Sequence, residues 1–210
     1  MNRELFLELE KTIFKTLKRE DIAADNVADI LGVLIDLKPA MTADFGEEEF
    51  KILDFEYFKN LISDLSLKIV FLKRPYKSAF KEEVLNYYFI SKDETKASSL
   101  RELFKSLWKN IDEKGNIIDK GAWVDITQKI GGLLGYPETA LEEFVRLSDE
   151  DIMSETRRAR MGRNRYYSHS AEYENEEYES YDKKLNQAIE NYAPMTAKVL
   201  KFETGKRWLD

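Results

Sequence analysis

Apolar side chains recur every three or four positions in three stretches that fill most of the first 66 residues. This spacing puts the apolar side chains of each stretch on one stripe of an α-helix, and such a stripe needs to be buried against another element. We therefore expect three amphipathic helices, at residues 3–18, 21–37 and 47–66, with Pro39 ending the second. Their apolar positions are Leu5, Phe6, Leu9, Ile13, Phe14 and Leu17 in the first, Ile22, Val27, Ile30, Leu31, Leu34 and Leu37 in the second, and Phe50, Ile52, Leu53, Tyr57, Leu61, Ile62 and Leu65 in the third.

Two shorter segments, residues 67–72 and 86–91, are rich in β-branched and aromatic side chains. The first is followed by a turn signal at Arg74-Pro75, and this composition is typical of strands. We predict two strands, with a short helix at residues 77–84 between them. Because an isolated two-stranded sheet is marginally stable, the strands must pack on helices or pair with another chain.

Helical patterns return after the second strand. Two S-x-x-E sequences, starting at Ser91 and Ser99, fit the capping box at a helix N-terminus, and a helix is expected from there to about Asn110. The predicted fold class is therefore α+β, mostly helical with a small β-sheet. Further helices are predicted at 122–134, at 138–147, at 183–192 and, after a break at Pro194, to about residue 202.

The chain length of 210 residues fits one domain with a small appendage. We predict a helix-rich α+β core over residues 1–147 and a polar segment rich in arginine, tyrosine and glutamate over 148–182. Residues 183–210 are predicted to be a C-terminal helical segment that packs on the core.

The chain contains no cysteine and a single histidine, His169. Disulfides, thiolate nucleophiles, cysteine-ligated zinc and iron–sulfur clusters are therefore excluded. One histidine also excludes a multi-histidine metal site within one chain. We predict no metal site and no cofactor.

No apolar run approaches the roughly 18 residues of a membrane span, and the N-terminus lacks the pattern of a signal peptide. We predict a cytoplasmic protein without a membrane partner. The net charge of −7 is unevenly distributed, since residues 1–66 carry 8 basic and 15 acidic side chains and residues 67–110 carry 10 basic and 5 acidic ones. Local basic patches govern nucleic-acid binding, so the acidic average lowers the odds of such a partner without excluding it.

Residues 110–121 lie between two predicted helices and have a partial likeness to a calcium-binding loop, with Gly115 at the sixth position. Lys114 occupies a ligand position, however, and Gly121 replaces the bidentate glutamate at the twelfth. We predict an ordinary helix–loop–helix connection and no tight calcium binding.

Residues 127–144 fit a helix-turn-helix pattern, in which Gly131 would allow close approach of the helices and Gly135 would supply the turn. The second helix of a DNA reader enters the major groove, where carboxylates would face the phosphates. We therefore predict a tight helical hairpin that does not read DNA. The second helix carries Glu138, Glu142 and Glu143, with Arg146 as its basic residue.

The sequence from Lys129 to Pro137, which includes Leu-Gly-Tyr-Pro and is followed by Phe144, resembles an uncharacterised prokaryotic family, domain of unknown function 483. The segment from Phe89 to Glu94, followed by a charged helix, is also similar, so the resemblance covers residues 86–147. It departs at Thr139-Ala140, where family members usually carry two cysteines. The resemblance implies a prokaryotic source and a related fold, and it implies no activity.

The polar segment begins with five arginines in nine residues, followed by two tyrosines and His169. An acidic run with interleaved tyrosines follows at 172–182, and no basic residue occurs from 171 to 182. Arginine beside tyrosine suits phosphate groups and bases. The alternative is that the basic and acidic runs neutralise one another on a solvated surface. The candidate anion-binding residues are Arg157, Arg158, Arg160, Arg163, Arg165, Tyr166, Tyr167 and His169.

His169 is also a candidate general acid or base, although the sequence assigns it no carboxylate partner. The leading hypothesis is a non-enzymatic binding or assembly module, with a protein or an anionic ligand as partner. The alternatives are a nucleic-acid-associated protein and a hydrolase or transferase that uses His169, arginines and carboxylates. The sequence identifies neither a catalytic residue nor an oligomeric state.

Overall fold

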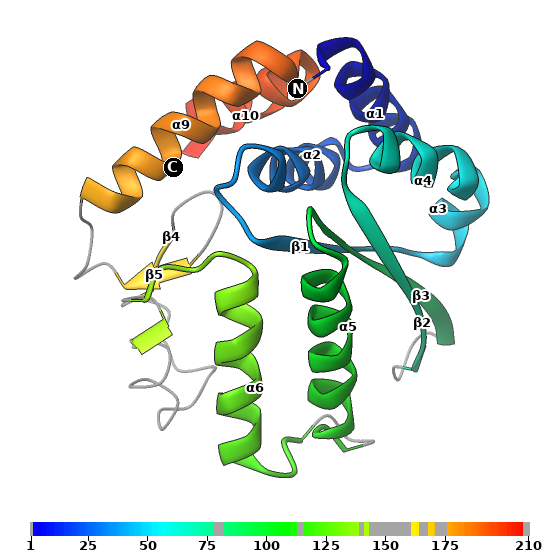
Figure 1. Cartoon of the computed structure of the whole chain (residues 1–210), viewed down its shortest axis with the longest axis vertical. Coiled ribbons are helices and arrows are strands. Elements are labelled where there is room, and N and C mark those ends of the chain that lie inside the picture. The colour runs from blue at the N-terminus through cyan, green and yellow to red at the C-terminus, as the bar shows by residue number, and fades with distance from the viewer. Residues whose placement is uncertain are drawn as a thin grey trace.

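A computed structural model describes residues 2–77, 82–112, 116–138, 141–142, 161–163, 168–170 and 176–207 of the chain. Helices dominate the described residues and surround a small antiparallel sheet (Figure 1), so the predicted fold class is confirmed. The elements are α1 (Arg3–Thr16), α2 (Glu20–Leu34), β1 (Ala40–Phe45), α3 (Glu47–Ile52), α4 (Phe55–Asp64), β2 (Lys68–Lys77), β3 (Glu82–Ser91), α5 (Glu94–Lys109), α6 (Lys120–Leu133), β4 (Met161–Arg163), β5 (Ser168–Ser170), α9 (Glu176–Tyr192) and α10 (Pro194–Arg207).

The main sheet has the strand order β1-β3-β2, and both pairings are antiparallel. Successive residues of a strand point to opposite faces, so the sheet supplies two apolar faces. Figure 1 shows α5 and α6 on one side of this sheet and the remaining long helices on the other. The sheet is thus a layer between two groups of helices.

The larger core lies between the sheet and α1, α2, α4, α9 and α10. Helix α2 is central to it, because nine of its residues are buried. Tyr88 of β3 is fully buried in this core, where its ring packs against Phe45 and Phe58 and its hydroxyl donates to Oδ1 of Asn26 at 3.1 Å. The hydrogen bond satisfies the one polar atom of that side chain, as a buried phenol requires.

The smaller core lies on the opposite face of the sheet, beneath α5 and α6. Phe89 of β3 packs edge-on against Phe104 of α5, with ring centroids 5.4 Å apart. Ala97 and Leu100 of α5 and Ile130 of α6 complete its buried centre. The two cores share β3, whose residues alternate between them.

Two predictions about local structure are wrong, and one strand was missed. The helix predicted at 77–84 is contradicted at its described residues, since Lys77 belongs to β2 and residues 82–84 belong to β3. Strand β1, which was not predicted, adds a third strand to the sheet. The single helix predicted at 47–66 is two helices, because Asp54 interrupts it and caps α4 by accepting from the backbone N–H of Tyr57 at 3.0 Å.

The C-terminal helices pack on the larger core through apolar side chains that include Leu185, Ile189 and Leu200. Helix α9 begins at Glu176, before the start predicted at residue 183, so the last part of the predicted polar segment belongs to this helix. The buried carboxylate of Glu10 accepts a hydrogen bond from the backbone N–H of Thr196 at 2.8 Å and so ties α1 to the first turn of α10. Within the described residues, we find no helix that combines the length and the hydropathy needed to cross a membrane.

Candidate binding surfaces

The predicted anion-binding segment is described only in part. Strands β4 and β5 pair antiparallel, with Gly162 opposite His169 and Arg163 opposite Ser168. The pairing therefore brings two of the predicted site residues, Arg163 and His169, to adjacent rungs of one ladder. The other predicted site residues lie outside the described residues, and they are Arg157, Arg158, Arg160, Arg165, Tyr166 and Tyr167.

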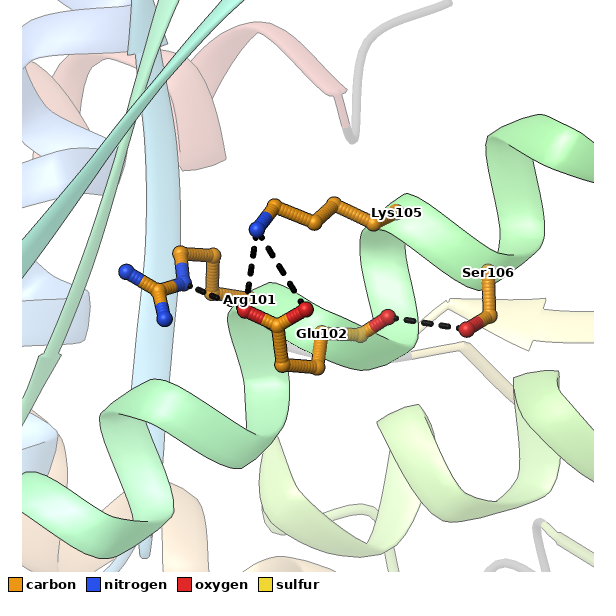
Figure 2. Close-up of polar contacts among 4 residues, drawn as sticks. All are labelled: Arg101, Glu102, Lys105 and Ser106. Carbon is orange, nitrogen blue, oxygen red and sulfur yellow. Dashed lines mark hydrogen bonds and ion pairs between the residues drawn. The ribbon is translucent and has the colours of Figure 1, made fainter.

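The basic stretch 67–110 does not form one basic surface, because its charges are distributed over separate elements. On α5, Arg101 and Lys105 both contact the carboxylate of Glu102, at 2.8 and 3.0 Å (Figure 2). The hydrogen bond from Lys105, together with that from Arg101, lowers the pKa of Glu102. Ser106 donates to the backbone carbonyl of Glu102 at 3.0 Å, as Figure 2 also shows. Two cations therefore share one carboxylate within this helix, and the group keeps one net positive charge.

Two cationic side chains towards the C-terminal end of β2 lie over aromatic rings. The guanidinium of Arg74 lies 4.4 Å from the ring centroid of Trp108 on α5. The ammonium of Lys73 lies 5.9 Å from the ring centroid of Phe50 on α3. Because α3 and α5 lie on opposite faces of the sheet, the two side chains flank the strand from both sides. A ring contact attracts a cation but leaves its N–H donors free for an anionic partner.

The loop at 110–121 uses its polar side chains to build its own turn. Asn110 bridges the loop, because its side chain donates to the carbonyl of Asp119 at 2.6 Å and accepts from the N–H of Asp119 at 2.9 Å. Asp112 accepts from the backbone and side chain of Asn116 at 2.7 and 3.0 Å. These contacts support the interpretation of this segment as a connection between α5 and α6.

The Leu-Gly-Tyr-Pro turn ends α6 with a Schellman motif, as predicted for Gly135. Its φ is +81°, the N–H of Tyr136 donates to the carbonyl of Gly131 at 2.9 Å, and the N–H of Gly135 donates to that of Gly132 at 3.2 Å. Helical backbone resumes at residue 138, directly after Pro137. Gly131 permits the predicted close approach, since a Cβ there would lie 2.5 Å from Cδ2 of Leu141.

A buried ion pair lies below this turn. The side chain of Lys38 is 6% exposed and its ammonium pairs with the carboxylate of Asp29 on α2. Burial, with a smaller contribution from the charge of Asp29, raises the pKa of Tyr136. A Cβ at Gly135 would lie 3.2 Å from the Leu37 carbonyl oxygen, Lys38 Cα and Pro39 Cδ, so residues 37–39 pack closely against the turn. These contacts fasten the turn to the segment that leads into β1.

Two hollows on the outer surface share the exposed face of α1. One, of about 520 Å³, is lined by apolar side chains of α1 and by Met195 of α10. The other, of about 180 Å³, is lined by Ile52 of α3 and Tyr57 of α4. Lys11 and Lys15 border both hollows, and Lys18 borders the larger one. Ile52, Tyr57 and Met195 are 50%, 42% and 39% exposed, which places three large exposed apolar or aromatic side chains around a row of lysines.

Lys11, Lys15 and Lys18 are termed the lysine row. One of them, Lys11, has an acidic neighbour. Glu8 lies 3.7 Å from the ammonium of Lys11 and accepts from the hydroxyl of Tyr57 at 3.2 Å. Burial and the neighbouring charge of Glu8 raise the pKa of that phenol. Among the described residues, Lys15 and Lys18 have neither a hydrogen-bonding nor an ion-pair partner. Two ammonium groups therefore remain free beside exposed apolar surface.

The remaining acidic residues around the hollows are placed at helix N-termini. Asp54 is the N-cap of α4, and Glu20 is the first residue of α2. A helix N-terminus carries a partial positive charge that offsets a carboxylate within its first turn. Both carboxylates are therefore partly compensated by their own helices.

No group of three or more histidine, aspartate and glutamate side chains that could hold a metal ion occurs among the described residues. The described carboxylates instead cap helices or pair with lysines, as Glu10, Asp54 and Asp29 do. These residues are accounted for by structural contacts.

Comparison with known proteins found no family model, no curated protein and no solved structure that matches the chain. The resemblance of residues 86–147 to the family with domain of unknown function 483 therefore stays a prediction.

The lysine row was not singled out as a site by the sequence analysis. Its signal is present in the sequence, since Lys11, Lys15 and Lys18 follow one another at helical spacing. The hollows beside it are formed by α3, α4 and α10, which are distant in the sequence. The helical spacing alone indicates a solvated face, and only the packing of these helices adds apolar walls to it.

Proposed function

We propose that the protein is a non-enzymatic binding or assembly module, and that its partner is a protein segment with acidic groups beside apolar side chains. The observation that carries this proposal is the lysine row, with Lys11 and Lys15 on α1 and Lys18 just beyond its end, where the unpaired ammonium groups of Lys15 and Lys18 border hollows with exposed apolar walls. Interfaces commonly combine an apolar centre with a charged rim that selects the partner. The row and its two hollows have this arrangement.

Charge and hydropathy together favour a protein segment over a polyphosphate backbone at this surface. Nucleic-acid affinity comes chiefly from many phosphate contacts, whereas the row offers two free cations beside Ile52, Tyr57 and Met195. Glu8, Glu20 and Asp54 line the same hollows and would repel a continuous polyanion. A segment with separated carboxylates can avoid them.

The test is binding of a fluorescent 18-residue helical peptide that has glutamate on one face and leucine on the other. We expect wild-type protein to bind it, and Lys15→Glu/Lys18→Glu to bind about tenfold more weakly, because exposed ion pairs are worth up to about 1 kcal/mol each. The control is Lys96→Glu/Lys109→Glu, which makes the same charge change on exposed residues of α5. Equal binding by all three proteins, or no binding by wild type, would discard the proposal.

The arginine-rich segment is proposed as a second anion-binding element of the same module. In its described part Arg163 and His169 lie on adjacent rungs of one ladder, whose side chains point to opposite faces, so the proposal rests on the composition of the segment. The test is a panel of nucleotides, RNA and single-stranded DNA against wild type and an Arg158→Ala/Arg160→Ala/Arg163→Ala variant. We expect binding that weakens with salt and is lost in the variant, and equal binding by both proteins would remove the element from the proposal.

A further inference from the structure

The outer edge of β2 is open over the part of the chain that the structure describes. β2 pairs with β3 on one side, and no described strand pairs with its other side. The opposite edge of the sheet is different, because β1 has six residues and buries Ala40, Met41 and Phe45. In β2, residues 69–72 are half-buried, so apolar side chains reach the edge without being fully covered. An edge of this kind can accept an added strand.

Pro75 indicates which backbone groups face outward. Proline has no N–H, so within a paired strand it fits where that N–H would point away from the ladder. Pro75 is paired with Val84 of β3, and its nitrogen therefore belongs to the outer edge. Since the direction alternates along a strand, the N–H and C=O groups of Ile69, Phe71 and Lys73 also face outward. These three residues, which alternate with inward-facing ones, carry enough outward N–H and C=O groups to pair with a short peptide.

The charged side chains of β2 are all basic. They are Lys68, Lys73, Arg74 and Lys77. Lys73 and Arg74 lie on opposite faces of the sheet, over Phe50 and Trp108 respectively, so cations flank the edge from both sides.

We propose that β2 accepts an extended acidic peptide as a fourth strand of the sheet. Main-chain hydrogen bonds to the outward groups of Ile69, Phe71 and Lys73 would hold the peptide, and its carboxylates would pair with the flanking cations. Charge opposes the same pairing between two copies of this chain, because an antiparallel pair centred on Phe71 would place Lys68 of one copy opposite Arg74 of the other. The basic edge thus selects an acidic partner.

This inference rests on the proposed function in that the protein is a binding module, but it concerns a different surface from the lysine row. The probe is a blocked nine-residue peptide of alternating glutamate and valine. One control peptide has lysine in place of glutamate, and another is N-methylated at every residue, which removes its backbone hydrogen-bond donors. Backbone hydrogen exchange of the full chain reports directly on residues 69–73.

We expect the acidic peptide to slow exchange at residues 69, 71 and 73 by at least about tenfold, and neither control peptide to do so. Lys68→Glu/Arg74→Glu should weaken binding about tenfold or more, whereas Lys15→Glu/Lys18→Glu should leave it unchanged. Lys68→Glu alone, at the exposed start of β2, provides a milder variant should the double variant fail to fold, and it too should weaken binding. If the lysine-row peptide fails and this one binds at β2, the proposed site on α1 is wrong and the β2 inference stands.

Several outcomes would overturn the inference. Absence of protection at residues 69–73, or equal protection by the N-methylated peptide, would show that strand addition does not occur. Concentration-dependent protection of the same residues without peptide would assign the edge to self-association. Binding of an oligouridylate RNA at these residues, in place of the peptide, would assign it to nucleic acid.

Discussion

Replacement of Gly135 by valine tests the account of the Leu-Gly-Tyr-Pro turn. The backbone there has φ of +81°, which costs an L-residue about 1–2 kcal/mol, and more when it is β-branched. A Cβ at this position would also lie 3.2 Å from the Leu37 carbonyl oxygen, Lys38 Cα and Pro39 Cδ, and crowding of this kind costs about 1–3 kcal/mol. We therefore expect Gly135→Val to lower the free energy of unfolding by about 2–5 kcal/mol.

The assay is thermal unfolding followed by circular dichroism, where about 2–4 °C per kcal/mol for a chain of this size predicts a loss of roughly 4–20 °C. Gly135→Asn separates the two contributions, because asparagine tolerates positive φ but keeps the crowded Cβ. Gly132→Ala is the matched control, since nothing lies within 4 Å of its Cβ, and it should be neutral or stabilising by up to about 1 kcal/mol. An unchanged melting temperature for Gly135→Val, or an equal loss for Gly132→Ala, would refute the reasoning.

Three further predictions concern other contacts. Glu10→Ala should cost about 1–3 kcal/mol in urea unfolding because the buried N–H of Thr196 loses its acceptor, and Glu10→Gln should cost less; equal losses would contradict this. Burial raises the pKa of Tyr88 well above its ordinary value, so its contribution to stability is complete below about pH 10, the pKa of an unfolded tyrosine, and is lost as pH rises further. Tyr88→Phe, which loses the hydrogen bond to Asn26, should cost about 1 kcal/mol at neutral pH and show a shallower alkaline loss of stability, and an equally steep loss would count against this account. Calorimetry with calcium should show no micromolar binding at 110–121, and such binding would overturn our interpretation of that loop.

The sequence predicts the helices well where their caps coincide with the ends of apolar periodicity. It misses the division between α3 and α4, because apolar side chains recur at helical spacing on both sides of Asp54. An aspartate before Phe55 is a capping signal, but within a continuous stripe it also fits a solvated helical position. Only the backbone conformation at residue 54, which is extended, distinguishes the two.

The sheet was predicted less completely, because strand pairing is a tertiary interaction. β1 is six residues long and contains two alanines, so it has little strand preference of its own and depends on its antiparallel register with β3. Residues 77–84 lack an Asn-Gly or Asp-Gly turn signal, so the sequence did not indicate a hairpin and a helix was predicted there. In the structure, Lys77 instead pairs with Glu82 in the hairpin.

The candidate surfaces show the same division between local and tertiary information. Helical spacing in the sequence places Lys11 and Lys15 of the lysine row on one face of α1, with Lys18 just beyond the helix, but apolar walls beside the row come from α3, α4 and α10. The basic character of β2 is likewise visible in its composition, whereas its position at the open edge depends on the strand order. The charge of each surface could therefore be predicted from the sequence. The apolar walls and the open strand edge beside those charges could not, because they depend on tertiary packing.

The Leu-Gly-Tyr-Pro turn, on which the family resemblance chiefly depends, joins the two layers of helices. Gly135 must adopt positive φ and lie against residues 37–39, and the same segment is fixed from below by the buried pairing of Lys38 with Asp29. Tyr136 fills the space that Gly131 leaves open, since a Cβ there would lie 3.2 Å from its ring. Each of these requirements is satisfied within the chain. A turn of this kind, shared with another protein, therefore indicates similar packing of the helices around it. Binding partners are to be sought where charges remain free, along the lysine row and at the edge of β2.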